Sequence, residues 1–191
     1  MAATQPIRKK HEVRALAFYY FKRGQIRNYV LLVLGIFTAL RISDLLRLRW
    51  DDVYDFKSKR VRGHIDIIEK KTKKSKTIAL NRHAICALRI FAPKAAKQGG
   101  FIIENINTGK SISRIQAYRI IRRASDDLEF QVRVSCHSLR KTFGYHAWKS
   151  GVSPVVIMEI YNHSSLGVTR RYLGVTQDDK NKVYLDLDLR V

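Results

Sequence analysis

One segment of the chain, residues 26–40, is apolar on nearly every side of the helix that its spacing predicts. A helix without a polar face is stable only where protein or a bilayer covers it. Its longest apolar run, residues 29–40, contains Gly35 and Thr38 and is shorter than the roughly 20 residues that cross a bilayer. We therefore expect a buried central helix that the remaining elements surround.

Apolar periodicity and capping residues predict further helices around this central one. Ser153 followed by Pro154 is a strong helix start, because the pair supplies a cap and then a first helical residue. Asn81 can cap a helix that ends near Phe91, with Pro93 beyond its end. The other predicted helices cover residues 12–22, 44–49 after a Ser43 cap, a stretch that begins at Ser111 or Ser113, 137–149, 169–173 and a final helix after Thr176.

Residues 51–80 have a different pattern, in which Val61, Ile65 and Ile67 alternate with polar residues. This alternation predicts two or three antiparallel strands with a basic turn at residues 70–76. The expected fold class is mainly α with a small antiparallel β-sheet. The 191 residues fit a single domain over residues 1–191, with a flexible N-terminus at about residues 1–10 and a C-terminal helix or tail at 176–191.

The charge of the chain indicates its partner. The 37 Lys and Arg against 16 Asp and Glu give a formal net charge of +21, and the basic residues are spread along the whole chain. Such a field attracts polyanions, so nucleic acid is a better candidate than a membrane surface. Cys86 and Cys136 have no disulfide or zinc-ligand spacing, and we expect both to be reduced and partly buried. No signal-peptide pattern is present, which favours a cytoplasmic protein.

Two clusters in the last third of the chain carry groups that can act on a phosphodiester. His137 precedes Arg140 by one helical turn, and His163 precedes Tyr172 by nine residues. Cations for the phosphate oxygens, proton-transfer groups and a hydroxyl nucleophile are together sufficient for cleavage without a metal. A His and an Arg at this spacing are weak evidence alone, because they recur by chance in an Arg-rich chain.

Four motifs together resemble the tyrosine recombinases, the phage-integrase family. Residues 38–50 (TALRISDLLRLRW) resemble the first arginine box, and Lys71-Thr72 resembles the catalytic lysine hairpin. Residues 137–143 (HSLRKTF) resemble the second box, and residues 162–165 (NHSS) with 168–172 (VTRRY) resemble its end and the nucleophile. The motifs keep the family's order. The resemblance implies the tyrosine recombinase catalytic-domain fold.

The same resemblance implies a role for each matching residue. Tyr172 would attack the scissile phosphate and form a covalent 3′-phosphotyrosine. His137 would assist removal of its proton, and Lys71 would protonate the 5′ leaving oxygen. Residues expected to support these steps are Arg41, Arg140 and His163, which would hold the non-bridging oxygens, and Asp44, which would orient the site through hydrogen bonds. The family needs no metal, ATP or other cofactor.

The resemblance also implies double-stranded DNA as the partner, assembly as a homo-tetramer on paired sites from a monomer in solution, and a bacterial, phage or mobile-element setting. About 25 residues precede the first buried helix, so we expect a catalytic domain without a separate core-binding domain, and an accessory DNA-binding protein could complete the contact with DNA. Asn162 replaces the family's usual Gly, and Asn tolerates the left-handed backbone that this turn needs. Expected DNA contacts, each with a solvated basic surface as its alternative, are Lys73, Lys74, Lys76, Arg114, Arg119, Arg122, Arg123 and Lys141.

Three other functions remain open from the sequence. A type IB topoisomerase shares the phosphotyrosine chemistry, and a DNA-binding accessory protein could keep the fold without turnover. A metal-dependent nuclease would use Asp51-Asp52 or Asp126-Asp127. Adjacent acids point to different faces of a regular element, which disfavours a shared metal.

Overall fold

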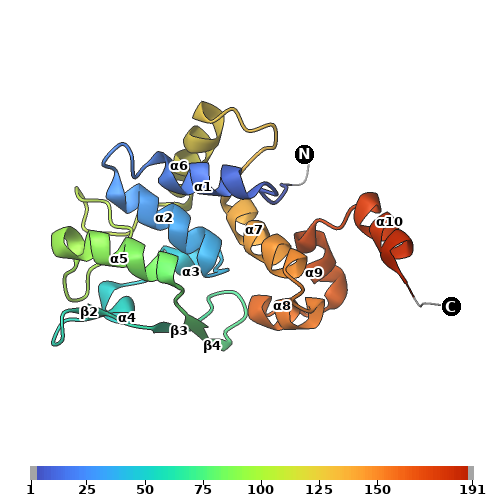
Figure 1. The fold of residues 1–191 in the computed structure, drawn as a ribbon. Coiled ribbons are helices and arrows are strands. Elements are labelled where there is room, and N and C mark those ends of the chain that lie inside the picture. Colours follow the sequence, from blue (N-terminus) through green and yellow to red (C-terminus); the bar gives the residue numbers. More distant parts are fainter. Residues whose placement is uncertain (1–3, 189–191) are drawn as a thin grey trace.

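The computed structural model describes residues 4–188 and places α2 (Ile26–Phe37) at the centre of the larger part of the molecule (Figure 1). The helices that pack against it are α1 (Lys10–Tyr19), α5 (Arg82–Ala95) and α7 (Cys136–Lys149). All residues from Asn28 to Ile36 are buried, so the expected central helix is confirmed.

The central helix ends earlier than its apolar run predicts. Thr38 donates its hydroxyl to the Leu34 carbonyl, and Ala39 then adopts a left-handed backbone with φ of 56°. An L-residue in this conformation cannot continue a right-handed helix. The turn directs the chain into α3 (Ile42–Leu45), whose N-cap is Arg41, so the predicted Ser43 cap is wrong.

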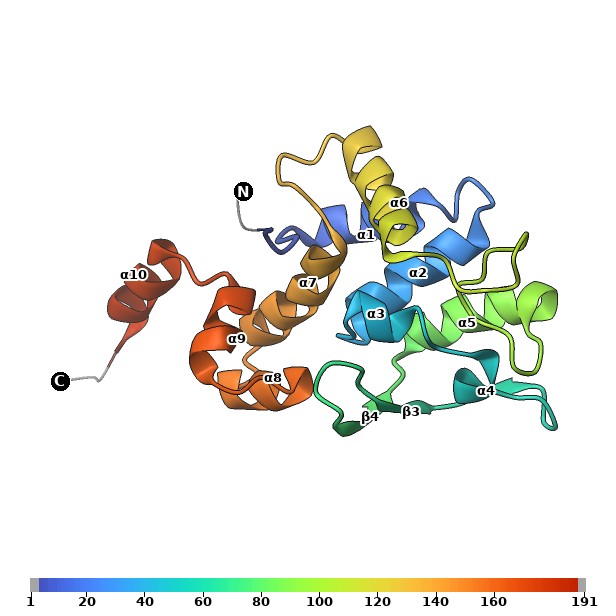
Figure 2. The same ribbon diagram turned by 180° about the vertical axis from the view of Figure 1, so that it is seen from behind.

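The remaining helices extend from this body in two directions. Figure 2 shows α6 beside α1 at one end, and α8, α9 and then α10 beyond α7 at the other. No helix within residues 4–188 is long and apolar enough to span a membrane. The remaining helices are α4 (Trp50–Val53), α6 (Arg114–Asp127), α8 (Pro154–Tyr161), α9 (Leu166–Leu173) and α10 (Gln177–Asp186).

The predicted antiparallel strands are present as two small sheets. In the first, β1 (Tyr54–Asp55) pairs with β2 (Arg60–Val61). In the second, β3 (His64–Ile68) pairs with β4 (Ser75–Ala79), with Ile65 opposite Ile78. The basic turn between β3 and β4 faces α8 (Figure 1).

Several local predictions are wrong for reasons of packing. Helix α5 continues past Pro93, because Ala92 is held against the core and its carbonyl accepts a hydrogen bond from the Ala96 N–H. Ile115 of α6 is 63% exposed, since the buried face of α6 is formed by Ala117, Ile121 and Ala124, which are spaced three and four residues apart. Cys86 is exposed, and only Cys136 is partly buried as expected.

The segment before α1 contacts α7 from Thr4 onward, and residues 1–3 lie outside the described residues. The expected flexibility of about residues 1–10 stays a prediction. Ile7 is fully buried, and its N–H donates to the Thr142 hydroxyl at 2.9 Å. The Thr4 carbonyl accepts a hydrogen bond from the Lys141 ammonium at 2.6 Å. The N-terminal segment therefore packs on α7.

The close approach of α7 and α8 generates a stability prediction. Gly144 faces the fully buried Tyr161, and a Cβ at Gly144 would overlap the Tyr161 ring and hydroxyl. We expect Gly144→Ala to lower the free energy of unfolding by about 2 kcal/mol in urea denaturation, because the ring has no space to move into. Gly63→Ala is the control, since a Cβ there meets nothing within 4 Å. Equal stability of the two variants would contradict this packing.

Candidate active site

Three cationic side chains converge on the C-terminus of α8. The Lys76 ammonium donates to the Ile160 carbonyl. The Tyr161 carbonyl accepts from Arg140 Nη2 at 2.8 Å and from Arg41 Nη2 at 3.4 Å. The last carbonyls of a helix have no partner within it and carry partial negative charge, so cations are stable there. One helix end thus joins groups from α7, β4 and the start of α3.

Arg140 is the most buried of these cations, with a relative exposure of 1%. Its guanidinium donates to the Ala39 carbonyl and lies 4.4 Å from the centroid of the Tyr161 ring. The Tyr161 hydroxyl donates back to the Arg140 carbonyl at 2.5 Å. Burial, and then the charge of Arg41, lowers the pKa of Arg140 to about 10, so the group is cationic at neutral pH. The left-handed turn at Ala39 is therefore part of the site.

Arg41 contacts a carboxylate that the sequence analysis did not select. Arg41 Nη1 lies 2.9 Å from Glu69 Oε2, and Glu69 is fully buried. The same oxygen accepts from the Asn162 amide at 3.0 Å and the Thr72 hydroxyl at 2.6 Å. Glu69 is the only acid in the run of residues 68–76, and that isolation was the available sequence signal.

One arginine donor in the site remains without a partner. Within residues 4–188, Arg140 Nε is buried and has no hydrogen-bond partner, whereas Arg41 Nη1 lies 2.9 Å from Glu69 Oε2. Buried N–H groups are almost always paired, and an unpaired charged donor costs several kcal/mol unless a ligand satisfies it. Arg140 Nε is therefore a candidate contact for an anion.

Lys71 lies on the turn between β3 and β4, whose other residues bind two acids of the site. The Lys70 N–H donates to Asp44 Oδ1 at 2.9 Å, and Thr72 is bound to Glu69. Lys71 itself is exposed, and its charge acts on His137. The buried Asp44 thus holds the turn by a hydrogen bond, and its role in the reaction stays a prediction.

Lys76 was expected to contact DNA, and the structure contradicts this. Its side chain is turned inward to the Ile160 carbonyl. Burial, and then the charge of Arg140, lowers the pKa of Lys76 to about 8. Lys76 therefore supports the C-terminus of α8 instead of an outer surface.

The last two candidates follow the left-handed turn at Asn162, which has φ of 49° and ψ of 43° and replaces a glycine as expected. His163 Nδ1 lies 3.0 Å from the hydroxyl of the buried Thr169. The Tyr172 ring from α9 lies 4.7 Å from the His163 ring and 5.3 Å from the Tyr161 ring, between centroids. Three aromatic rings therefore pack together directly beside Arg140.

Tyr161 and Tyr172 differ in what their hydroxyls can do. Burial raises the pKa of Tyr161, and its hydroxyl is already used as a donor. Tyr172 is only partly buried, and its hydroxyl has no hydrogen-bond partner among residues 4–188. Tyr161 is therefore a structural residue, and the predicted role of Tyr172 as nucleophile stays a prediction.

His137 lies at the exposed edge of the site. Partial burial lowers its pKa, as do the charges of Lys141, Arg140, Arg41 and Lys71. A neutral imidazole at neutral pH can accept a proton. Lys141 lies with its ammonium 5.5 Å from the Tyr172 ring centroid. The structure thus brings all six predicted catalytic residues and Asp44 into one region.

The other predicted DNA contacts lie outside this region or at its margin. Lys73 and Lys74 are exposed on the β3–β4 turn. Arg122 is ion-paired with Asp126 at 2.7 Å, and exposed positions on α6 are held by Arg114, Arg119 and Arg123. Their contact with DNA stays a prediction.

The adjacent acids considered for a metal have structural partners. Asp51 accepts from the Gly99 N–H, Asp52 from the Arg49 N–H, and Asp127 from the Tyr19 hydroxyl. Among residues 4–188, no three His, Cys, Asp or Glu side chains are grouped as metal ligands. These acids thus stabilise turns and helix contacts.

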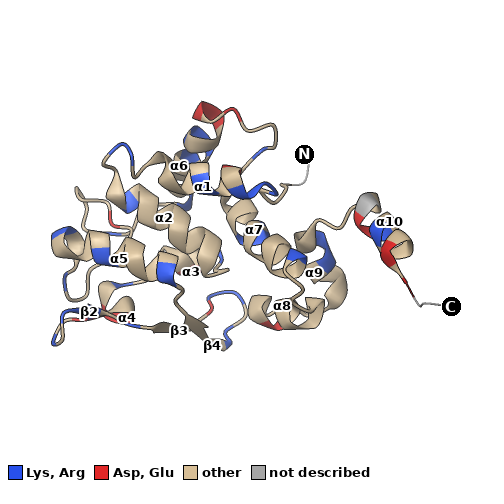
Figure 3. Cartoon of the chain, in the orientation of Figure 1, with Lys and Arg blue, Asp and Glu red and all other residues tan. Residues whose placement is uncertain are grey.

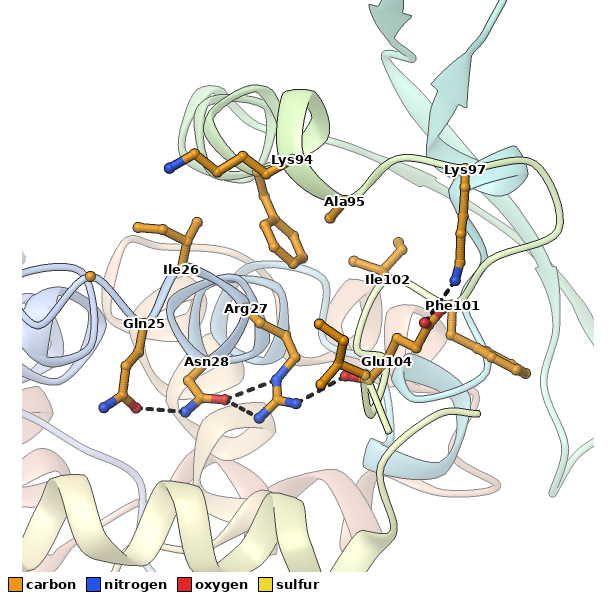
Figure 4. A pocket seen from close by; sticks show the side chains of 13 residues that line it. Gln25, Ile26, Arg27, Asn28, Lys94, Ala95, Lys97, Phe101, Ile102 and Glu104 are labelled. Carbon is orange, nitrogen blue, oxygen red and sulfur yellow. Dashed lines mark hydrogen bonds and ion pairs between the residues drawn. The ribbon is translucent and has the colours of Figure 1, made fainter. Parts of the chain in front are cut away.

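A separate cleft of about 780 Å³ lies between α5 and the start of α2 (Figure 4). Its polar groups bind one another: Arg27 donates to Asn28 and to the Glu104 carbonyl, and Lys97 pairs with the Glu104 carboxylate at 2.8 Å. None of the predicted catalytic residues lines it. The predicted catalytic residues therefore lie near the α8 terminus and not in this cleft.

His163 generates a pH prediction. Burial, and then the charges of Arg140 and Arg41, lowers its pKa to about 4. In the unfolded chain, His163 has an ordinary pKa of about 6.5, so between the two pKa values the unfolded state binds more protons than the folded state. The free energy of unfolding therefore falls as the pH decreases through this window. We expect the loss of unfolding free energy from pH 7 to pH 5 to be about 1 kcal/mol larger in the wild type than in His163→Gln. Identical pH dependence in urea titrations would contradict a low pKa.

Comparison with known proteins identifies the family. The family model described as "Phage integrase family" matches residues 7–179. A probable integrase/recombinase, YoeC of Bacillus subtilis, is 34% identical over 184 residues, which is 96% of this chain and 97% of that protein. A tyrosine recombinase of Pseudothermotoga lettingae is 29% identical over 162 residues, and the chain spans only 54% of its length.

Solved structures confirm the predicted fold. The XerA recombinase matches with a TM-score of 0.78 and 18% identity, covering 100% of this chain and 66% of that one. The XerH site-specific recombinase, in a post-cleavage complex with a palindromic difH substrate, matches with a TM-score of 0.76 over 96% of this chain and 53% of that one. The predicted recombinase fold and resemblance are thus confirmed, and the chain belongs to the phage integrase family, whose members are tyrosine recombinases.

Proposed function

We propose that this protein is a site-specific DNA recombinase that cleaves and rejoins DNA through a covalent 3′-phosphotyrosine. The observation that carries the proposal is the meeting of the Arg41 and Arg140 guanidiniums at the Tyr161 carbonyl, with the Tyr172 ring 5.3 Å from the Tyr161 ring. Guanidinium groups bind phosphate oxygens with charge-assisted hydrogen bonds. A tyrosine hydroxyl next to a phosphate held in this way is placed for attack on phosphorus.

The chemical step uses the residues of one site. The Tyr172 oxygen forms a bond to phosphorus while the bond from phosphorus to the 5′ oxygen breaks. His137 accepts the phenol proton, and Lys71 donates a proton to the leaving 5′ oxygen. Arg41, Arg140 and His163 hold the non-bridging oxygens, whose charge increases in the transition state. Reversal of these steps with a new 5′ hydroxyl rejoins the strands.

The low pKa of His163 defines how it acts. A neutral imidazole has one N–H donor and one acceptor nitrogen. If Nδ1 accepts from the Thr169 hydroxyl, Nε2 carries the proton and can donate to a phosphate oxygen. In that arrangement the buried Thr169 would select the tautomer that this role needs.

Double-stranded DNA is the substrate that the charge supports. Figure 3 shows Lys and Arg on most elements of the fold. The formal net charge of +21 predicts binding that weakens steeply as salt increases. XerH is bound to its difH substrate in the matched structure, and we extend DNA binding to this chain by that analogy. Cleavage by the residues above needs neither metal nor ATP.

The first test is trapping of the covalent intermediate on a nicked suicide DNA substrate in the presence of a chelator. We expect wild-type protein to form an adduct and Tyr172→Phe to lower its yield by at least about 1,000-fold, since the nucleophile is removed. Tyr145→Phe is the matched control, because this partly buried tyrosine of α7 lies outside the ring cluster. Adduct formation by Tyr172→Phe would exclude Tyr172 as the nucleophile.

We further propose that the protein acts as a homo-tetramer on paired sites, with α10 docking on a neighbouring subunit. Helix α10 extends beyond α9 at the edge of the molecule (Figures 1 and 2). Val183, Tyr184 and Leu185 are 66%, 82% and 84% exposed. Apolar side chains exposed together in this way are typical of an interaction surface.

Truncation after Gly174 tests this docking. In a Tyr172→Phe background, which removes cleavage, we expect the truncated chain to bind a single site about as well as the full chain but to lose the two-site complex in a mobility-shift assay. Circular dichroism establishes that the shortened chain is folded. Formation of the two-site complex without residues 175–191 would contradict docking by α10.

A further inference from the structure

Glu69 has surroundings unlike those of any other acid in the site. It directly follows β3, is fully buried, and joins three separate segments through the single atom Oε2. Its partners are Arg41 at the start of α3, Asn162 at the end of α8, and Thr72 in the β3–β4 turn. The other oxygen, Oε1, is buried and has no hydrogen-bond partner within the described residues.

The carboxylate is ionised despite this burial. Burial alone raises the pKa of Glu69, but hydrogen bonds from Thr72 and Asn162 and the charge of Arg41 outweigh it, and the net pKa is lowered. An ionised acceptor forms stronger hydrogen bonds than a neutral one. Glu69 therefore binds its three partners firmly at neutral pH.

The turn that carries Lys71 is fixed on both sides of that residue. On one side the Lys70 N–H binds Asp44, and on the other the Thr72 hydroxyl binds Glu69. The Lys73 N–H donates to the Glu69 carbonyl at 2.9 Å, and Lys73 has a left-handed φ of 58°. Lys71 lies between two anchored neighbours, so the position of its backbone depends on Glu69.

We propose that Glu69 is a positioning residue that places Lys71 at the leaving oxygen, a role that rests on the proposed DNA cleavage. Because Glu69 also contacts Arg41 and Asn162, it fixes the turn relative to the phosphate-binding groups. Its charge partly neutralises Arg41. Glu69→Gln keeps an acceptor without the charge, so this variant should hold the turn, and its arginines should bind the phosphate at least as well.

Substrates that differ only in the leaving atom separate this role from a general structural one. When sulfur replaces the bridging 5′ oxygen, the thiolate leaves without a proton, so cleavage no longer depends on Lys71. Single-turnover rates on matched oxygen and sulfur suicide substrates are compared for wild type, Lys71→Ala, Glu69→Ala, Glu69→Gln and Thr72→Val. Thermal unfolding is measured for each variant.

We expect Glu69→Ala to lower the rate on the oxygen substrate by about 10-fold or more and on the sulfur substrate by less than about 3-fold. Glu69→Gln keeps an acceptor for Thr72, so its rate on the oxygen substrate should fall less than that of Glu69→Ala. Thr72→Val should repeat the pattern of Glu69→Ala with a smaller loss of stability. The matched control is Glu104→Gln, which removes the charge of a partly buried, ion-paired carboxylate in the cleft of Figure 4 and should leave both rates unchanged.

The other outcomes are informative in different ways. Equal losses on both substrates for Glu69→Ala and Thr72→Val would overturn positioning of Lys71, whatever the thermal stability. An oxygen-specific loss in Lys71→Ala but not in Glu69→Ala would also overturn it. Absence of any wild-type adduct on either substrate would overturn the proposed cleavage, and this proposal with it.

Discussion

The binding of cations to the C-terminus of α8 is the interaction on which the site depends. The Ile160 and Tyr161 carbonyls accept hydrogen bonds from Lys76, Arg140 and Arg41, which belong to elements far apart in sequence. Grouping like charges is unfavourable unless negative charge offsets it, and the helix terminus supplies part of this. Glu69 and Asp44 supply the rest as buried carboxylates. The segments that carry Arg41, Lys76 and Arg140 are thus held together before any substrate binds.

The same helix end sets the positions of the reactive groups. Asn162 turns the chain in a left-handed conformation directly after Tyr161, which places His163 beside the Tyr172 ring. Tyr161 fills the space over Arg140, and Gly144 leaves room for its ring. The two neighbouring tyrosines therefore have separate functions: one stabilises the packing, and the other presents its hydroxyl. Such prior placement would limit the rearrangement that the proposed phosphate binding requires.

The sequence predicts the elements whose signals are local. Local signals determine α2 through its apolar run, α5 and α8 through the Asn81 and Ser153 caps, and β3 and β4 through their alternation. The family motifs contain the expected catalytic residues. Errors occur where tertiary packing decides. Pro93 remains helical because Ala92 packs on the core, and Lys76 turns inward because a helix terminus lies beside it. Glu69 was missed because its three partners are 3, 28 and 93 residues away, as the positions of Thr72, Arg41 and Asn162 give.

The central claim is that one tyrosine beside this cation cluster becomes linked to DNA. The most direct measurement is mass spectrometry of the trapped protein–DNA adduct after digestion with protease and nuclease, combined with end-labelling of the released strand. We expect a nucleotide attached through its 3′ phosphate to the peptide that contains Tyr172, and a released strand with a free 5′ hydroxyl. A link to any other residue, or a strand released with a 5′ phosphate, would contradict it.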